Sequence, residues 1–170
     1  MKHPLYQILA ALMLVVAAAP ASRAGAQGAP VELRILAIND FHGNLRPPTG
    51  GIRIADPDDK SKKIVVSAGG VETMATVVKQ LREGHSNTIF VAAGDLIGAS
   101  PFLSAMFHDE PTIESLSMMG LGIASVGNHE FDEGKDELLR MQNGGCHPTD
   151  QCRGPHPFLG AGFQIGRAHV

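Results

Sequence analysis

Three short clusters of polar residues carry side chains that suit metal binding and acid–base chemistry. Asp40 and His42 form an Asp-x-His triplet, Asp95 follows a glycine, and Asn128 precedes a histidine in the run GNHEFD. Carboxylate, imidazole and amide donors suit a borderline divalent ion such as Zn2+ or Mn2+. Asp95 offers two oxygens, so it could bridge two cations about 3.5 to 4 Å apart, the separation found in two-metal hydrolytic sites.

The third cluster also supplies a pair for proton transfer. His129 could face a phosphate group, and Asp132, three residues later, could orient its imidazole. Each pattern alone has an ordinary explanation, because an Asp-x-His triplet usually has no metal role, an Asp after Gly often caps a turn, and a lone histidine often lies at the surface. The run GNHE is rarer, with a chance occurrence on the order of a thousandth in such a chain. The combination favours a catalytic site.

Alternating strands and helices are expected to bring these clusters together. Apolar, β-branched runs predict strands, at residues 31–38, 88–93, 121–126 and starting within 158–163. Helical spacing predicts an amphipathic helix and two shorter ones, at residues 71–82, 101–107 and 111–118. Residues 43–63 are rich in Gly, Pro and Asp and predict a surface loop. Because such strands pair in parallel, their carboxyl ends share one edge of a sheet, where ligands collect.

Length and charge limit the classes of function. A chain of 170 residues holds one domain with a core. It carries 14 basic and 17 acidic side chains, with no stripe of Lys or Arg interleaved with aromatic residues. A nucleic acid polymer is therefore not expected as a partner.

Both ends of the chain are expected to lie outside the fold. Residues 1–26 have the charged start, apolar run and small-residue cleavage pattern of a signal peptide, so the mature chain is expected to begin near Gln27. A retained membrane anchor is the alternative, although the apolar run at 8–19 is short for a bilayer core of about 30 Å. We expect a periplasmic or secreted protein with no membrane contact after cleavage. Residues 165–170 (IGRAHV) resemble a translated sequencing adapter, and we expect a disordered, non-native tail; an unstructured native tail is the alternative.

Cys146 and Cys152 lie close together in the run CHPTDQC. In an exported chain such a pair is expected to form a disulfide bond that closes a small loop. A soft-metal site is the alternative, but it would need four ligands with Cys-x-x-Cys spacing.

Four stretches across residues 31–164 resemble one known family. NDFHGNL, GGVETMATVVKQLR, AGDLIGASP and GNHEFD, in this order, are similar to the opening motifs of the 5'-nucleotidase family of calcineurin-like metallophosphatases. The resemblance implies an α/β fold, the metallophosphatase-type α/β/β/α sandwich, with only its first part present. Residues 27–164 would then be the N-terminal part of the catalytic domain.

The resemblance also implies roles for the three clusters. Asp40 and His42 would bind the first of two divalent metal ions, Asp95 would bridge both, and Asn128 would bind the second. His129 and Asp132 would form the catalytic dyad. The expected reaction is hydrolysis of a nucleotide phosphate by a metal-activated water. Nucleoside 5'-monophosphates are the favoured substrates, and nucleotide sugars or 2',3'-cyclic nucleotides remain open.

The chain also departs from the family pattern. Family members take further metal ligands from later histidines, and nothing after Asp132 supplies them in a matching segment. His147, His156 and His169 lie in or near the cysteine loop or in the suspect tail, so they are not assigned as ligands. The C-terminal domain that holds the nucleoside is missing. The alternative is therefore a truncated, non-catalytic fragment with at most weak binding of divalent metal.

Overall fold

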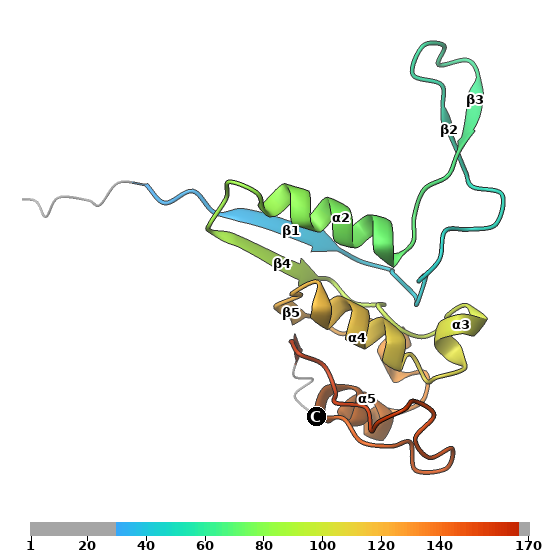
Figure 1. The fold of residues 1–170 in the computed structure, drawn as a ribbon, viewed down its shortest axis with the longest axis vertical. Helices are drawn as coiled ribbons and strands as arrows, with labels where there is room; N and C mark the ends of the chain where they lie inside the picture. The colour runs from blue at the N-terminus through green and yellow to red at the C-terminus, as the bar shows by residue number, and fades with distance from the viewer. Residues whose placement is uncertain (1–29, 167–170) are drawn as a thin grey trace, which may run out of the picture. The chain divides into compact units, whose positions relative to one another are not determined.

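The structure is a computed structural model that describes residues 30–166 (Figure 1). All elements lie in the compact unit that begins at Glu32. The strands are β1 (Arg34–Ile38), β2 (Ile52–Ala55), β3 (Lys63–Val66), β4 (Thr88–Ala92), β5 (Ile123–Ala124) and β6 (Gln164–Ile165). The helices are α2 (Val71–Arg82), α3 (Phe102–Ala105), α4 (Glu110–Met118), the 3-10 turn η1 (His129–Phe131) and α5 (Lys135–Asn143).

A parallel sheet with the strand order β1-β4-β5-β6 organises this unit. β1 and β4 pair along their whole length, so that Ile38 lies beside Ala92 at their carboxyl ends. The predicted strands at 31–38, 88–93 and 121–126 are confirmed as β1, β4 and the shorter β5. Parallel pairing therefore brings the segments that follow β1, β4 and β5 to the same edge of the sheet.

The sheet buries one face and exposes the other. Leu36 and Phe90 face the core, and Phe90 is 2% exposed. Their neighbours Ile35, Ile89 and Ile123 point the opposite way, because side chains alternate along a strand, and about half of each side chain is exposed. Among the described residues, the helices therefore bury one face of the sheet and leave the other exposed.

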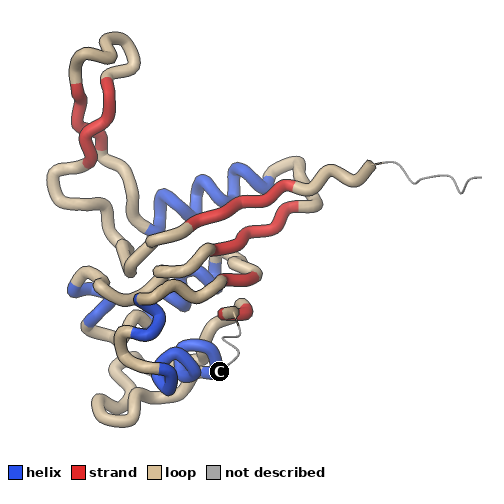
Figure 2. Tube along the Cα trace, turned by 180° about the vertical axis from the view of Figure 1, so that it is seen from behind, coloured by secondary structure: helices blue, strands red, loops and turns tan. Residues whose placement is uncertain are grey.

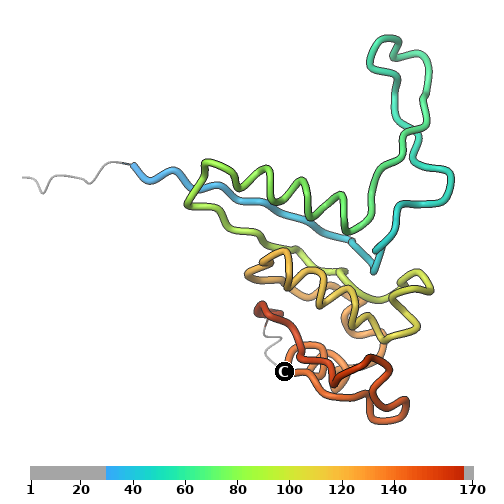
Figure 3. Tube along the Cα trace, in the orientation of Figure 1, coloured from blue at the N-terminus to red at the C-terminus, as the bar shows by residue number. Residues whose placement is uncertain are grey.

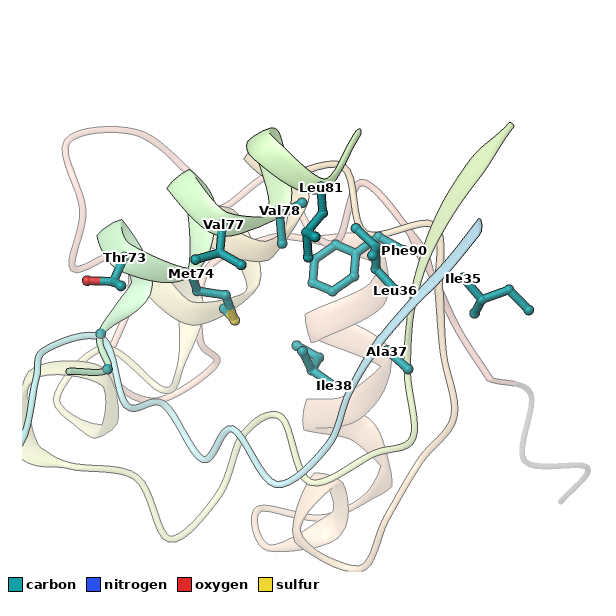
Figure 4. A pocket seen from close by; sticks show the side chains of 12 residues that line it. Ile35, Leu36, Ala37, Ile38, Thr73, Met74, Val77, Val78, Leu81 and Phe90 are labelled. Atoms are coloured by element: carbon teal, nitrogen blue, oxygen red, sulfur yellow. The ribbon is translucent and has the colours of Figure 1, made fainter. Parts of the chain in front are cut away.

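Helix α2 confirms the predicted amphipathic helix and lies alongside β1 and β4 (Figure 1). Its apolar residues recur at helical spacing and face the sheet, as Met74, Val78 and Leu81 do in Figure 4. These side chains line an apolar cavity of about 420 Å³ together with Ile38 and Phe90. The expectation of a core face thus holds for Val78, which is buried, and for Val71 and Met74, which pack against the core, whereas Val77 and Leu81 are more than 40% exposed.

The second half of the core forms around α4 and α5. Ile113 and Leu116 on α4 and Met141 on α5 are at most 1% exposed, and Phe158 and Phe163 pack into the same cluster. Helix α4 fits the predicted segment 111–118, and the predicted segment 101–107 shortens to α3. Helix α5 was not predicted; it starts after Gly134, whose φ of 87° favours a residue without a side chain.

Two expectations were wrong, one about a loop and one about the start of a strand. The predicted loop 43–63 contains β2 and the start of β3, which pair with each other in a separate antiparallel hairpin (Figure 2). Their side chains are largely exposed, so burial left no periodic signal in the sequence. The strand expected to start within 158–163 forms later, as β6.

Part of the suspected tail is ordered. Ile165 lies in β6 beside Ala124 and is 7% exposed, although disorder was expected from this residue onward. Its apolar side chain reaches the core, which the composition of the hexapeptide does not reveal. The predicted signal peptide and residues 167–170 lie outside the described residues. No helix in residues 30–166 is long and apolar enough to cross a membrane.

Candidate metal centre

The segments after β1 and β4 run side by side and exchange backbone hydrogen bonds (Figure 3). The N–H of Asp40 donates to the carbonyl of Gly94 at 3.1 Å, and the N–H of His42 donates to the carbonyl of Asp95 at 3.0 Å. The parallel ladder thus continues past the strands as a paired loop. Two of the three sequence clusters meet as a direct result.

The three predicted ligands on these loops have an unusual backbone conformation. Asp40, His42 and Asp95 have φ angles of 50°, 45° and 51°, in the left-handed region that residues with side chains rarely adopt. Such conformations concentrate at functional sites, where the surrounding structure maintains them. The side chains of these three residues also converge: one potential ligand atom from each lies within 4.8 Å of the others.

A hydrogen bond fixes the orientation of the His42 ring. Its Nδ1 lies 2.9 Å from the carbonyl oxygen of Gly98, which can only accept, so Nδ1 is the donor in this contact and Nε2 is the nitrogen available to a metal ion. Nε2 lies 3.8 Å from Oδ1 of Asp40. A histidine ligand normally donates its other N–H to a carbonyl or carboxylate in this way. The donor set of two carboxylates and an oriented imidazole therefore fits a divalent cation.

The third cluster contacts Asp95 through its backbone. The N–H of His129 donates to Oδ1 of Asp95 at 3.0 Å. A Cβ atom on Gly127 would lie 2.2 Å from the same oxygen, so only glycine allows this approach. Asn128 lies between these two residues in the sequence and is exposed. The backbone on either side of Asn128 is thus held against Asp95, and the role of Asn128 as a metal ligand stays a prediction.

His129 and Asp132 form the predicted hydrogen-bonded pair. Nδ1 of His129 lies 2.8 Å from Oδ2 of Asp132. This hydrogen bond raises the pKa of His129, burial opposes it, and the charges of Asp132, Asp95 and Glu130 add to the rise. The His129 ring meets the His42 ring edge to face, with centroids 4.9 Å apart. The dyad therefore lies against the group formed by Asp40, His42 and Asp95.

Glu130 belongs to this centre, although the sequence alone gave it no role. Its side chain is 5% exposed, and its oxygens accept N–H groups from Asp95 at 2.9 Å, Leu96 at 2.7 Å and Gly127. The one available signal in the sequence was its position in the run GNHEFD, between residues that had already been assigned roles. Periodicity gave no indication of its burial, because it lies in the short turn η1.

A second group of acidic and imidazole side chains lies outside this centre. His108, Glu133, Glu137 and His147 each place a potential ligand atom within 4.8 Å of the others. However, Nδ1 of His108 is 2.9 Å from Glu133 and Nε2 is 3.1 Å from Asp150, so both nitrogens act as donors to carboxylates. Burial lowers the pKa of His108, but these two hydrogen bonds and the charges of Glu133 and Glu137 together outweigh it and raise the pKa overall. This group is best described as an ion-pair network.

The network connects the segments that precede α4 and α5 to a loop closed by a disulfide bond. Cys146 and Cys152 are bonded, with Cα atoms 4.5 Å apart. Within the loop, the ring of His147 stacks on His108 with centroids 3.9 Å apart, and its Nδ1 accepts the N–H of Asp150 at 3.1 Å. The soft-metal alternative for the cysteines has no geometric support among the described residues.

Comparison with known proteins identifies the family. Residues 33–160 match the calcineurin-like phosphoesterase family. The chain belongs to this family. It is therefore a member of a family of hydrolases that use divalent metal ions, in agreement with the converging donors of Asp40, His42 and Asp95. The resemblance seen in the sequence is confirmed.

Individual relatives match different shares of their own length. An uncharacterised protein in the pqq-V 5' region of Acinetobacter calcoaceticus is 43% identical over 148 residues, which cover 85% of this chain and 72% of that protein. Endonuclease YhcR of Bacillus subtilis is 39% identical, and the match covers 79% of this chain and 10% of YhcR. The NAD 5'-nucleotidase of Haemophilus influenzae is 29% identical, over 82% of this chain and 22% of that enzyme. The chain thus spans a minor part of the longer relatives.

A solved structure supports the fold class. The Haemophilus influenzae NAD nucleotidase superposes with a TM-score of 0.56 at 24% sequence identity, over 78% of this chain and 23% of that chain. The expected metallophosphatase-type α/β fold with a parallel sheet is therefore confirmed.

Proposed function

We propose that the chain carries part of the active site of a phosphoester hydrolase that acts on nucleotides, in the manner of a 5'-nucleotidase. The observation that carries this proposal is the convergence of Asp40, His42 and Asp95 beside the pair formed by His129 and Asp132. Relatives that are named NAD 5'-nucleotidase and 5'-nucleotidase support a nucleotide as the substrate.

Each side chain has a role in this proposal. Asp40 and His42 would hold one divalent cation, Asn128 would hold a second, and Asp95 would contribute to both sites. When bound, the two cations supply Lewis-acid stabilisation of the phosphate oxygens and acidify the attacking water. Zn2+ and Mn2+ both suit this combination of oxygen and nitrogen donors.

His129 is the acid or hydrogen-bond donor toward the phosphate. Its Nδ1 is held by Asp132, which leaves Nε2 as the nitrogen that faces substrate. The pKa of His129 is raised, with the hydrogen bond to Asp132 as the largest cause, so the protonated ring persists to a higher pH than in a free imidazole. Nε2 donates to a phosphoryl oxygen or to the leaving oxygen, and Asp132 keeps the ring in position.

The direct test is release of phosphate from AMP or p-nitrophenyl phosphate in the presence of Mn2+ or Zn2+. Metal-dependent turnover is expected to disappear in Asp95→Ala. In His129→Ala it should fall by about 10²- to 10⁴-fold, the usual contribution of general acid catalysis. Turnover that persists unchanged in Asp95→Ala would exclude this site as its source.

A second candidate function is divalent-metal binding without turnover. The group at the sheet edge contains a single imidazole, and among residues 30–166 no other histidine joins the convergence of Asp40, His42 and Asp95. An incomplete ligand set weakens both metal affinity and electrostatic preorganisation. Mn2+ binding observed by electron paramagnetic resonance, together with no phosphate release, would select this function.

We also propose that the protein is exported. The basis is the signal-like sequence of residues 1–26, together with a disulfide bond between Cys146 and Cys152 that suits an oxidising compartment. Mass spectrometry of the protein recovered from the periplasm or the medium should give an N-terminus near Gln27. An intact Met1 on the recovered protein would contradict signal cleavage.

A further inference from the structure

We infer that Glu130 is a positioning residue that fixes the loop of Asp95 against the loop of Asn128 and so sets the affinity for divalent metal. This inference rests on the proposed function, because it assigns metal binding to Asp95 and Asn128. It adds a residue that touches neither a proposed metal ion nor the substrate. Its action is exerted through the backbone of the loops that carry the ligands.

The geometry of the Glu130 carboxylate joins two segments far apart in the sequence. Oε2 accepts the N–H of Asp95 at 2.9 Å and also the N–H of Gly127, while Oε1 accepts the N–H of Leu96 at 2.7 Å. Asp95 and Leu96 follow β4, whereas Gly127 follows β5. One buried side chain therefore satisfies backbone donors from both loops.

The two loops lie too close for any side chain to separate them. A Cβ atom on Gly94 would lie 2.5 Å from the nitrogen of Gly127, and one on Gly127 would lie 2.2 Å from Oδ1 of Asp95. Glycine permits this approach, but glycine also leaves the backbone free to adopt other conformations. The carboxylate of Glu130 supplies the constraint that the glycines lack.

Glu130 has no cationic partner among the described residues. The ion pairs in residues 30–166 do not include it, and its side chain is 5% exposed. A carboxylate held only by backbone N–H groups is acceptor-only, so each of its hydrogen bonds is charge-assisted and directional. Its negative charge also lies next to Asp95, where a bound cation would be attracted.

The alternative is that Glu130 merely contributes to the stability of the fold. Glu137 provides a matched control, because it is also a largely buried glutamate, 11% exposed, whose carboxylate accepts three hydrogen bonds from two nitrogens. Those donors belong to Arg140 on the same helix, and Glu137 belongs to the group around His108 rather than to the group formed by Asp40, His42 and Asp95. Glu130→Gln and Glu137→Gln make the same chemical change at the two positions.

The experiment measures Mn2+ affinity by electron paramagnetic resonance and the melting temperature by circular dichroism, for the full chain and both variants. Glu130→Gln places an NH2 group against a backbone N–H, so one donor loses its acceptor. Mn2+ affinity is expected to fall about 10- to 100-fold, the usual effect of losing a residue that orients metal ligands. Glu137→Gln is expected to lower the melting temperature while changing Mn2+ affinity less than about twofold.

Glu130→Asp keeps the negative charge on a side chain that is shorter by one methylene group. Its Mn2+ affinity is expected to lie between those of Glu130→Gln and the wild type. Equal Mn2+ affinity in wild type and Glu130→Gln would overturn the inference and leave the proposed function intact. Absence of Mn2+ binding by the wild type would overturn the proposed function itself, and this inference with it. If both Glu130 variants fail to fold while Glu137→Gln folds, Glu130 is a residue of fold stability and the positioning role is wrong.

Discussion

Replacing Asp95 with asparagine should separate the stability of the metal-free protein from its stabilisation by metal. The substitution keeps the shape of the side chain and an oxygen that can accept a hydrogen bond. In the wild type, the N–H of His129 donates to Oδ1 of Asp95 at 3.0 Å. The substitution removes one of the two negative charges contributed by Asp40 and Asp95. Because no cation separates those charges in the metal-free protein, their repulsion is a cost of folding.

The distance between the two carboxylates gives the magnitude. Their potential ligand atoms lie within 4.8 Å, so the repulsion is about 1 kcal/mol with a water-like dielectric and about 3.5 kcal/mol with the value of about 20 typical near a protein surface. The lower part of this range applies, since the Asp40 side chain is 60% exposed. The hydrogen bond from His129 loses about 1 kcal/mol when its acceptor becomes neutral. Relief of about 1 to 2 kcal/mol of repulsion less the loss of about 1 kcal/mol makes the metal-free variant as stable as the wild type, or up to about 1 kcal/mol more stable.

Metal should reverse the order of stability. At an Mn2+ concentration of about 100 times the dissociation constant, the wild type gains about 2.7 kcal/mol, or about 10 °C in melting temperature for a domain of this size. The variant lacks the carboxylate proposed to contact both ions, so it should gain much less. Thermal unfolding followed by circular dichroism at pH 8, with EDTA and then with a series of Mn2+ concentrations, measures both effects.

Two results would refute this reasoning. A metal-free variant that melts well below the wild type would show that the Asp95 carboxylate stabilises the fold by itself, and that this stabilisation exceeds the repulsion from Asp40. An equal rise in melting temperature with Mn2+ in both proteins would show that the cation binds elsewhere. Asp136→Asn, an exposed carboxylate on α5 that pairs only with Lys135 among the described residues, is the control for nonspecific charge effects.

Two further predictions concern the rest of the described chain. Cys146→Ser should lower the free energy of unfolding by about 2 to 3 kcal/mol, because the disulfide closes a short loop; chemical denaturation that gives the same midpoint for wild type and variant under oxidising conditions would contradict this. Folding raises the pKa of His108 above its ordinary 6.5, since hydrogen bonds to Glu133 and Asp150 outweigh the effect of burial. Its contribution to stability is therefore complete below pH 6.5 and is lost as the pH rises through the higher, folded-state pKa. The stability difference between wild type and His108→Gln should shrink from pH 5.5 to pH 8, and a constant difference would show that protonation of His108 is not involved.

The sequence predicted the elements whose signals are local. The period of 3.6 in Val71 to Leu81 specified helix α2, and the apolar runs before Asp40 and Asp95 specified β1 and β4. Sequence-based prediction failed for strands that are mostly exposed and for a short strand that depends on a distant partner strand. The hairpin β2–β3 is mostly exposed, and β6 is a two-residue strand that exists because β5 offers a parallel edge.

By itself, the sequence determined which chemistry the chain could support. The types and order of Asp40, His42, Asp95, Asn128 and His129 favoured chemistry at a divalent metal, because few residue types bind such ions, and the family resemblance added phosphate as the expected substrate group. Only the tertiary structure decided that loops separated by more than 30 residues exchange hydrogen bonds at one edge of a sheet. It also decided that a buried Glu130 joins those loops, because burial and backbone contacts arise from packing between distant segments and leave no local periodic signal.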